Sequence, residues 1–198
     1  MRHPAGNVKV TFRLVLSRTG CYLKSVTAMQ IFSAGFNAGD DFAEVIAVCE
    51  RHGDYCLIGG NAVNAYSYTI FTADLDLVIA AGKLDAVAAD LTALGFERWD
   101  AKYSVNFRKP GSQLVIQFST DEMYQKYYPT AVVKKVLGLP VKVAAVENII
   151  AGKVAAWSDP QRNAAKRYKD AADLVRLLET YPNLKNLFPA QIVADVFK

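Results

Sequence analysis

The sequence predicts an α+β fold, in which a mixed β-sheet flanked by helices is followed by a C-terminal helical part. Short apolar runs that end in glycine or turn residues alternate with segments of helical periodicity over residues 40–145. Residues 146–198 are helical in pattern. We therefore expect a basic N-terminal extension over 1–39, a sheet-containing core over 40–145, and a helical region over 146–198 packed on that core.

Composition limits the classes of protein to which the chain can belong. Its 198 residues, 52% of them hydrophobic, suffice for one well-filled domain. The sequence has no run of about 20 apolar residues, the length needed to cross a bilayer, so we expect a soluble protein without a membrane partner. Three cysteines without a CxxC motif and two histidines argue against a zinc site and favour a cytoplasmic location.

Positive charge is concentrated at the N-terminus. Residues 1–39 hold five basic residues and no acidic one, whereas residues 40–198 hold 18 basic and 19 acidic residues. This balance argues against a broad basic face for nucleic acid. Residues 1–28 are interpreted as an extension inessential to the fold, an added strand, a targeting segment, or translated sequence upstream of a start at Met29.

The core elements follow in order from residue 40. Residues 40–53 combine an acidic first turn, apolar residues at helical spacing and a terminal glycine, which predicts a capped helix. A short buried strand then ends at Gly59-Gly60. We next expect a short helix or turn over residues 61–68, a strand over 75–80 and an amphipathic helix over 83–95. Three strands should follow over residues 96–101, 103–109 and 113–120.

The last third begins with a strand and continues with helices. Pro160, which follows Ser158 and Asp159, predicts the first turn of a long helix. We expect a strand over residues 139–145, a helix over 146–157 and this long helix over 158–181. A loop over residues 182–189 and a closing helix over 190–197 should follow.

Two carboxylates stand out within the strand predicted after the glycines. Asp74 and Asp76 are two residues apart, so on a strand they project from the same face. Two ionised carboxylates this close repel each other unless a positive charge lies between them, and oxygen ligands suit Mg²⁺ or Mn²⁺. Gly59 and Gly60 let backbone amides approach a phosphate. The segment therefore predicts a site for a nucleoside triphosphate with its metal.

The spacing of these residues resembles a known motif. Ile58-Gly59-Gly60, thirteen residues and Asp74-Leu75-Asp76-Leu77 are similar to the pattern of the nucleotidyltransferase fold, the superfamily of DNA polymerase beta. The resemblance implies that Asp74 and Asp76 hold the metal and act in catalysis. It also implies a nucleotide-binding role for the glycines and for Asn61 and Thr72.

The C-terminal third extends the resemblance to the AbiEii-like branch of bacterial toxin-type nucleotidyltransferases. In that pattern one helix carries a lysine, here Lys153, and the next carries a basic-Lys-Asp-x-x-Asp run. The resemblance implies nucleotide contacts from Lys153, Arg167, Lys169 and Asp170 and a cognate antitoxin or toxin partner. Taken alone, Lys153 is equally read as a lysine at a helix boundary. Asp170 and Asp173 are read either as partners of Lys166 and Lys169 in solvated i,i+4 pairs or as residues that orient Lys153 or Arg167.

The sequence departs from the family pattern at two positions. Ile70 occupies the place of an arginine two residues before Thr72. Gln117 stands where active members have a third carboxylate, and an amide cannot accept the proton of an attacking hydroxyl. Gln117 remains a candidate catalytic residue as a neutral oxygen donor. An acid from elsewhere is expected to fill the vacancy, and the candidates are Asp100, Asp121 and Glu122.

Three functions follow from these residues. The first is metal-dependent transfer of a nucleoside monophosphate from an NTP to a hydroxyl on RNA, protein or a small molecule, with RNA or protein favoured. The second is a nucleotide-binding member of a toxin–antitoxin or regulatory system that Gln117 has impaired in catalysis. The third is a structural domain without nucleotide affinity.

Tyr124, Tyr127 and Tyr128 either stack on a substrate or pack in the core.

Overall fold

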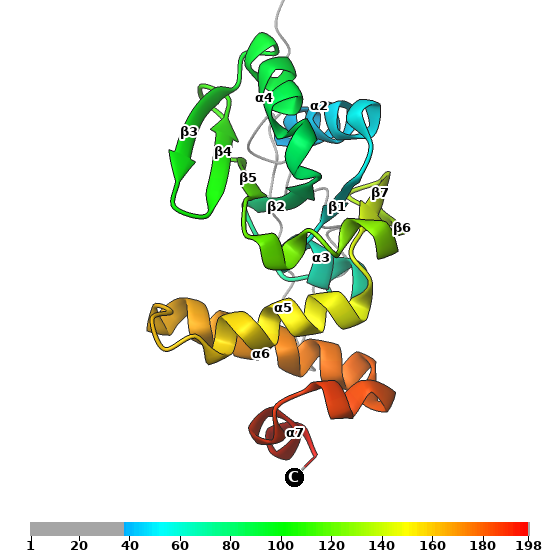
Figure 1. The fold of residues 1–198 in the computed structure, drawn as a ribbon. Coiled ribbons are helices and arrows are strands. Elements are labelled where there is room, and N and C mark those ends of the chain that lie inside the picture. Colours follow the sequence, from blue (N-terminus) through cyan, green and yellow to red (C-terminus); the bar gives the residue numbers. More distant parts are fainter. Residues whose placement is uncertain (1–37, 198) are drawn as a thin grey trace, which may run out of the picture.

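A mixed seven-stranded sheet, in the order β3-β4-β5-β2-β1-β7-β6, forms the centre of the molecule (Figure 1). The computed structural model describes residues 38–197. The strands are β1 Tyr55–Leu57, β2 Asp74–Ile79, β3 Glu97–Ala101, β4 Ser104–Arg108, β5 Val115–Ser119, β6 Val132–Val136 and β7 Leu139–Val143. The helices are α2 Ala38–His52, α3 Gly59–Tyr66, α4 Leu84–Ala93, α5 Val146–Ser158, α6 Ala164–Thr180 and α7 Ala190–Val196, with 3₁₀ turns η1 Ala81–Lys83, η2 Glu122–Tyr124, η3 Tyr128–Thr130 and η4 Pro182–Leu187.

Strand β2 lies at the middle of the sheet and carries the paired carboxylates. It runs parallel to β5 and antiparallel to β1, and β1 in turn runs parallel to β7. Leu75, Leu77 and Ile79 alternate with the carboxylates and are buried on the opposite face. The period-two pattern therefore divides β2 into an apolar face and a face with both acids. The α+β fold predicted from the sequence is confirmed.

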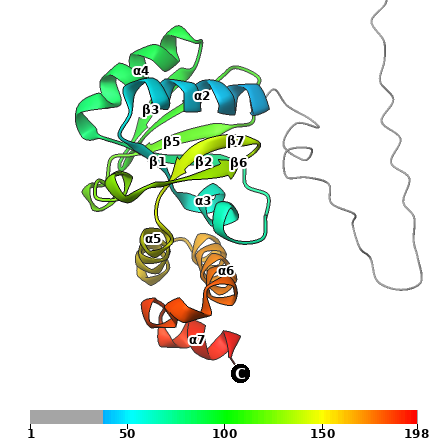
Figure 2. The same ribbon diagram turned by 90° about the vertical axis from the view of Figure 1, so that its right-hand side faces the viewer.

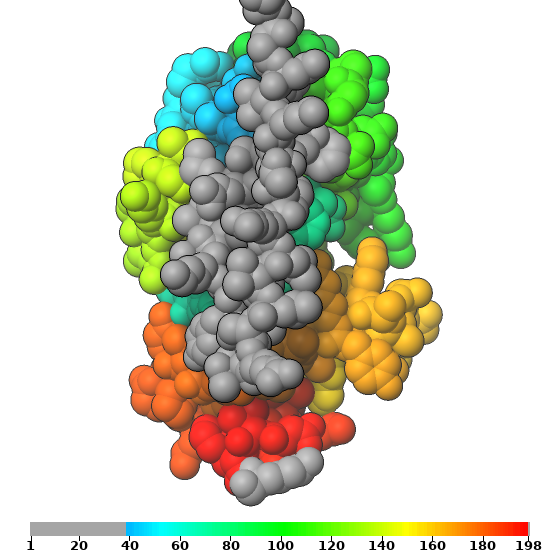
Figure 3. Space-filling view, turned by 180° about the vertical axis from the view of Figure 1, so that it is seen from behind, coloured from blue at the N-terminus to red at the C-terminus, as the bar shows by residue number. Residues whose placement is uncertain are grey.

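Helices cover both faces of the sheet. Figure 2 shows α2 and α4 on one face and α3 on the other, with α5 and α6 side by side below α3. In the space-filling view from behind, α7 lies at the opposite end of the molecule from α2 (Figure 3). The strand-to-helix connection at Gly59 thus places the start of α3 between the sheet and the C-terminal helices.

Strand β6 was not expected from the sequence. It is largely exposed and pairs with β7 through a two-residue turn in which Leu137 and Gly138 both have positive φ angles, of 48° and 91°. Such a turn matches the twist of a hairpin, but it is usually formed by Asn-Gly or Asp-Gly. Because Leu137 stands at the first turn position in place of Asn or Asp, the hairpin could not be predicted from the turn sequence.

The start of the long helix was predicted wrongly. Helix α6 begins at Ala164, not near Pro160, because the side chain of Asn163 accepts hydrogen bonds from the backbone N–H groups of Ala165 and Lys166. Asp159 accepts a bond from the Gln161 N–H, which closes a turn before the helix. Asparagine is among the strongest helix N-caps, so it defines the boundary.

None of the helices between residues 38 and 197 is long and apolar enough to span a membrane. Cys49 and Cys56 are buried and free. The predictions for residues 1–37, including the possible start at Met29, lie outside the described residues.

Candidate active site

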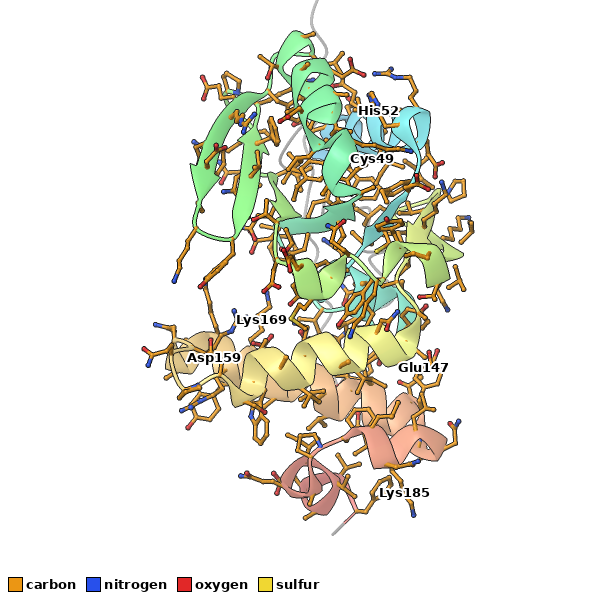
Figure 4. The ribbon with its side chains drawn as sticks, in the orientation of Figure 1. Cys49, His52, Glu147, Asp159, Lys169 and Lys185 are labelled. Atoms are coloured by element: carbon orange, nitrogen blue, oxygen red, sulfur yellow. The ribbon has the colours of Figure 1, made fainter. Side chains whose placement is uncertain are left out.

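A cavity of about 490 Å³ lies between the sheet and the C-terminal helices. The start of α3 and residues of β2 and β5 form its sheet side, and one face of α5 and the start of α6 form the other. The β3–β4 turn and residues of the 124–127 segment complete the lining. Figure 4 shows Lys169 in the region between the sheet and helices α5 and α6.

The paired carboxylates lie on the sheet side of this cavity. Asp74 is exposed and Asp76 is partly buried, and both line the cavity. Burial and the neighbouring negative charge of Asp74 raise the pKa of Asp76 to about 6, although the charges of Lys153 and Lys169 and a hydrogen bond from the Gly60 backbone act in the opposite direction. The ionised form of Asp76 is therefore electrostatically costly, and a cation between the two acids would relieve this cost.

The two glycines allow α3 to approach this carboxylate closely. Gly59 has a φ angle of 66°, and a Cβ atom added there would lie 1.9 Å from the Asp76 Oδ2 atom. A side chain at this position would be both strained and excluded by the carboxylate. A Cβ atom on Gly60 would meet the Thr72 Oγ1 atom at 3.3 Å. The need for glycine at position 59 is therefore to make room for the Asp76 carboxylate.

Gln117 lies beside the acids, as the family pattern predicts for the third carboxylate. In the parallel pairing of β2 with β5 it is the direct partner of Asp76, and it lines the cavity. The candidate replacement acids do not line the cavity. Asp100 pairs with Arg98 on the surface of the hairpin, Asp121 caps η2 by accepting a bond from the Met123 N–H, and Glu122 does not line the cavity.

The carboxylates of the cavity are therefore Asp74, Asp76 and Asp170. Among residues 38–197, no group of three or more His, Cys, Asp or Glu side chains is arranged to hold a metal. Asp74 and Asp76 can still hold Mg²⁺, because this ion takes one or two protein carboxylates and completes its shell with waters and substrate phosphates.

Lys153 is clamped between two aspartates of the neighbouring helix. Its Nζ atom lies 2.9 Å from Asp170 Oδ1 and 2.6 Å from Asp173 Oδ2, and its side chain is 12% exposed. Burial alone would lower the pKa of Lys153, but the charges of Asp173 and Asp170 outweigh it and the pKa is raised. The lysine therefore stays positive and has a fixed position at the cavity wall.

Each of the two aspartates that hold Lys153 also pairs with an arginine. Arg162 donates to Asp170 Oδ2, with Nη2 at 2.8 Å and Nε at 2.9 Å, and Arg176 donates to Asp173. Asp170 and Asp173 therefore orient Lys153, one of the roles expected for them, rather than forming solvated pairs with Lys166 and Lys169, because packing of α5 on α6 supplies a buried partner. Within residues 38–197, the cavity is lined by three carboxylates and by five cations, Lys102, Lys153, Arg162, Lys166 and Lys169.

Three of the predicted nucleotide-binding residues lie outside the cavity lining. Asn61 is buried, and its side-chain amide donates to the backbone oxygen of Asp74 at 2.7 Å, which fixes the start of β2. Thr72 is buried beneath Gly60, and Arg167 is exposed on α6. The other predicted residues are brought together around the cavity, where their roles in binding and catalysis stay predictions.

Sequence reasoning missed the cavity-lining residues Lys102 and Arg162. Both lie in turns, and no local pattern distinguishes such residues from ordinary surface charges. The aromatic cluster divides, because Tyr124 and Tyr127 line the cavity with their rings edge to face at 5.2 Å, whereas Tyr128 does not line it.

Solved nucleotidyltransferases have a similar fold. The crystal structure of ANT(2")-Ia in complex with adenylyl-2"-tobramycin superimposes with a TM-score of 0.58 at 18% identity, and the match covers 79% of this chain and 97% of that chain. The lincosamide antibiotic adenylyltransferase LnuA, bound to lincomycin, gives a TM-score of 0.50 at 9% identity over 70% and 96% of the two chains. A nucleotidyltransferase-like antigen from Paracoccidioides brasiliensis gives 0.50 at 18% identity over 81% and 88%.

At these identities the likeness is one of fold. A comparison with curated proteins gives no match. A family model described as "Nucleotidyl transferase AbiEii toxin, Type IV TA system" matches residues 70–198, which is more than half of the chain. The matched range begins after Gly59 and Gly60 and includes the paired carboxylates, Gln117 and the clamped Lys153. The chain therefore belongs to the AbiEii nucleotidyl transferase family.

Proposed function

We propose that this nucleotidyltransferase transfers a nucleoside monophosphate from an NTP to a hydroxyl group of RNA, with Mg²⁺ or Mn²⁺ bound at Asp74 and Asp76. The observation that carries the proposal is the meeting of two carboxylates, two glycines and five cations at one cavity. Asp74 and Asp76 on the sheet side and Lys153, Lys166 and Lys169 on the helix side suit a metal–triphosphate, whose charges are of both signs.

The residues fit a divalent cation. Burial and the charge of Asp74 on the same strand face raise the pKa of Asp76, and Gln117 adds a neutral oxygen beside the two acids. A bound metal ion would neutralise charge that develops on the transferred phosphoryl group. Lys153 and Lys169 would hold the phosphates, and Gly59 lets the start of α3 approach them.

In the proposed reaction, the acceptor hydroxyl oxygen bonds to the α-phosphorus of the NTP. The bond from that phosphorus to the bridging oxygen breaks, pyrophosphate leaves, and the hydroxyl proton passes to solvent water. Gln117 cannot take this proton, and Asp170 is held by Lys153 and Arg162. We therefore expect slow turnover, which an added carboxylate at position 117 would accelerate.

The charges around the cavity support RNA as the acceptor. An aminoglycoside such as tobramycin carries several amines that are positive at neutral pH, and Lys102, Lys166 and Lys169, the lining cations without an ion pair among the described residues, would repel it. The phosphates of RNA are attracted instead. Because the family model describes a type IV toxin–antitoxin system, we also propose a cognate antitoxin as a partner of this chain.

A labelling experiment tests the proposal. The purified chain is incubated with each labelled NTP, Mg²⁺ or Mn²⁺ and a cell extract, and label is followed on RNA and on protein. We expect label on RNA that disappears in Asp74→Ala and persists in Asp100→Ala, a control aspartate outside the cavity. Label on protein only would refute the RNA acceptor, and no label with any NTP would refute transfer.

A second function is favoured by Gln117 alone. A member that binds nucleotide without transferring it would show a rise in melting temperature with Mg²⁺ and NTP, because a ligand at about 100 times its Kd stabilises the folded state by about 2.7 kcal/mol. It would show no labelled acceptor. Gain of labelling in Gln117→Asp would identify the missing carboxylate as the cause.

A further inference from the structure

The tip of the β3–β4 hairpin forms a wall of the cavity. Lys102 and Tyr103 occupy the turn between the two strands, and both line the cavity. The Tyr103 side chain is 59% exposed, and the Lys102 ammonium lies 4.7 Å from the centre of its ring. The Tyr103 backbone oxygen accepts a hydrogen bond at 3.0 Å from the Thr120 N–H, which ties the turn to the end of β5. An aromatic ring and a cation are therefore presented together on a fixed turn.

The cations of the cavity fall into an inner and an outer group. Lys153 and Arg162 form ion pairs with Asp170, so they are the inner cations, whose charge is neutralised. Lys102 on the hairpin and Lys166 and Lys169 on α6 are exposed residues of the lining and form the outer group. Among the described residues, neither Lys102 nor Lys166 forms an ion pair with an acid in this structure. The outer lysines thus offer unneutralised charge to a second ligand.

We propose that Lys102 and Tyr103 form the acceptor subsite, in which the terminal base of a single-stranded RNA stacks on Tyr103 and an adjacent phosphate contacts Lys102 and Lys166. This subsite rests on the proposed function. An exposed ring stacks on any base, and a lysine beside it holds the backbone phosphate, so the pair suits the end of a strand rather than a duplex. The metal, Lys153 and Lys169 are left for the NTP. Tyr103 and Lys102 are therefore positioning residues for the acceptor.

The experiment compares matched variants of exposed residues in the full chain. Tyr103→Ala is paired with Tyr68→Ala, because Tyr68 is also 59% exposed and lies outside the cavity. Lys102→Ala is paired with Lys135→Ala on β6, an exposed lysine outside the cavity. Each variant is measured for its melting-temperature shift with Mg²⁺ and NTP, and for its affinity for a fluorescently labelled single-stranded RNA oligonucleotide by anisotropy.

We expect Tyr103→Ala to increase the Kd for RNA roughly tenfold, and Lys102→Ala to weaken binding and reduce its salt dependence by about one phosphate contact. In the transfer reaction, both changes should raise KM for RNA and leave kcat at saturating RNA unchanged. The shift caused by NTP should be the same in all four variants. Equal RNA affinity in Tyr103→Ala and Tyr68→Ala, or in Lys102→Ala and Lys135→Ala, would overturn the subsite.

The same measurements separate failure of the subsite from failure of the proposed function. If the parent chain transfers no nucleotide, the proposed function fails, yet the anisotropy comparison still shows whether the hairpin binds RNA. If the parent labels RNA and the hairpin variants match their controls in both Kd and KM, transfer stands and the subsite is refuted. RNA binding that no variant alters refutes it as well.

Discussion

Replacement of Asp76 by asparagine should stabilise the metal-free protein at neutral pH. Burial and the charge of Asp74 raise the pKa of Asp76 from 3.8 to about 6, and this shift corresponds to a cost of about 3 kcal/mol for the ionised carboxylate in the folded state. Asparagine has nearly the same shape and removes the charge. Its Oδ1 atom can also accept the hydrogen bond from the Gly60 backbone. We expect the free energy of unfolding to rise by up to about 3 kcal/mol.

The sign of the pH dependence follows from the same shift. Asp76 binds a proton more tightly in the folded than in the unfolded chain, so protonation stabilises the fold. This stabilisation is complete below a pH of about 4 and is lost as the pH rises through about 6. Between pH 7.5 and pH 5, the parent should gain about 1.4 kcal/mol relative to Asp76→Asn, which lacks the titrating group.

Urea unfolding of both proteins at pH 7.5 and pH 5, with EDTA present, measures these differences, because the other titrating groups cancel between parent and variant. In a second pair of measurements, saturating Mg²⁺ and NTP should stabilise the parent more than the variant, since only the parent keeps both carboxylates proposed to bind the metal. A variant less stable than the parent at pH 7.5, or a stability difference that does not change with pH, would refute the electrostatic reasoning at Asp76.

The other predictions concern two residues of the cavity wall, each with a matched control. Gly59→Ala should destabilise the fold by about 1 to 3 kcal/mol because of its positive φ angle and the clash with Asp76, whereas Gly82→Ala, which meets nothing within 4 Å, should be nearly neutral in urea unfolding. Equal losses would contradict the proposed close approach. Tyr127→Phe should leave stability unchanged or raise it, because its buried hydroxyl has no partner among the described residues. Tyr66→Phe, which loses a buried bond to a backbone oxygen, should lower the melting temperature, and the reverse order of the two variants would be unexpected.

The paired-acid motif could be predicted from the sequence because its geometry is local. Residues two apart on a strand share a face whatever the rest of the fold does, so the sequence alone places Asp74 and Asp76 together. Gly59 marks a strand-to-helix turn for a similarly local reason. The β6–β7 hairpin was missed because Leu137 adopts a turn conformation that leucine rarely takes, and only pairing between the strands supports it.

The partners of charged residues were decided by tertiary structure. Sequence spacing offers Asp170 a lysine one helical turn away, but packing of α5 against α6 brings Lys153 to it across seventeen positions of the chain. The near-neutral composition of residues 40–198 is no sign of a basic site, yet among the described residues five cations from the hairpin turn, α5, the α5–α6 connection and α6 meet at one cavity. The sequence by itself determined which residues share a strand face, because backbone periodicity is set locally. Only the folded chain decided which charges face each other, because that depends on contacts between segments far apart in sequence.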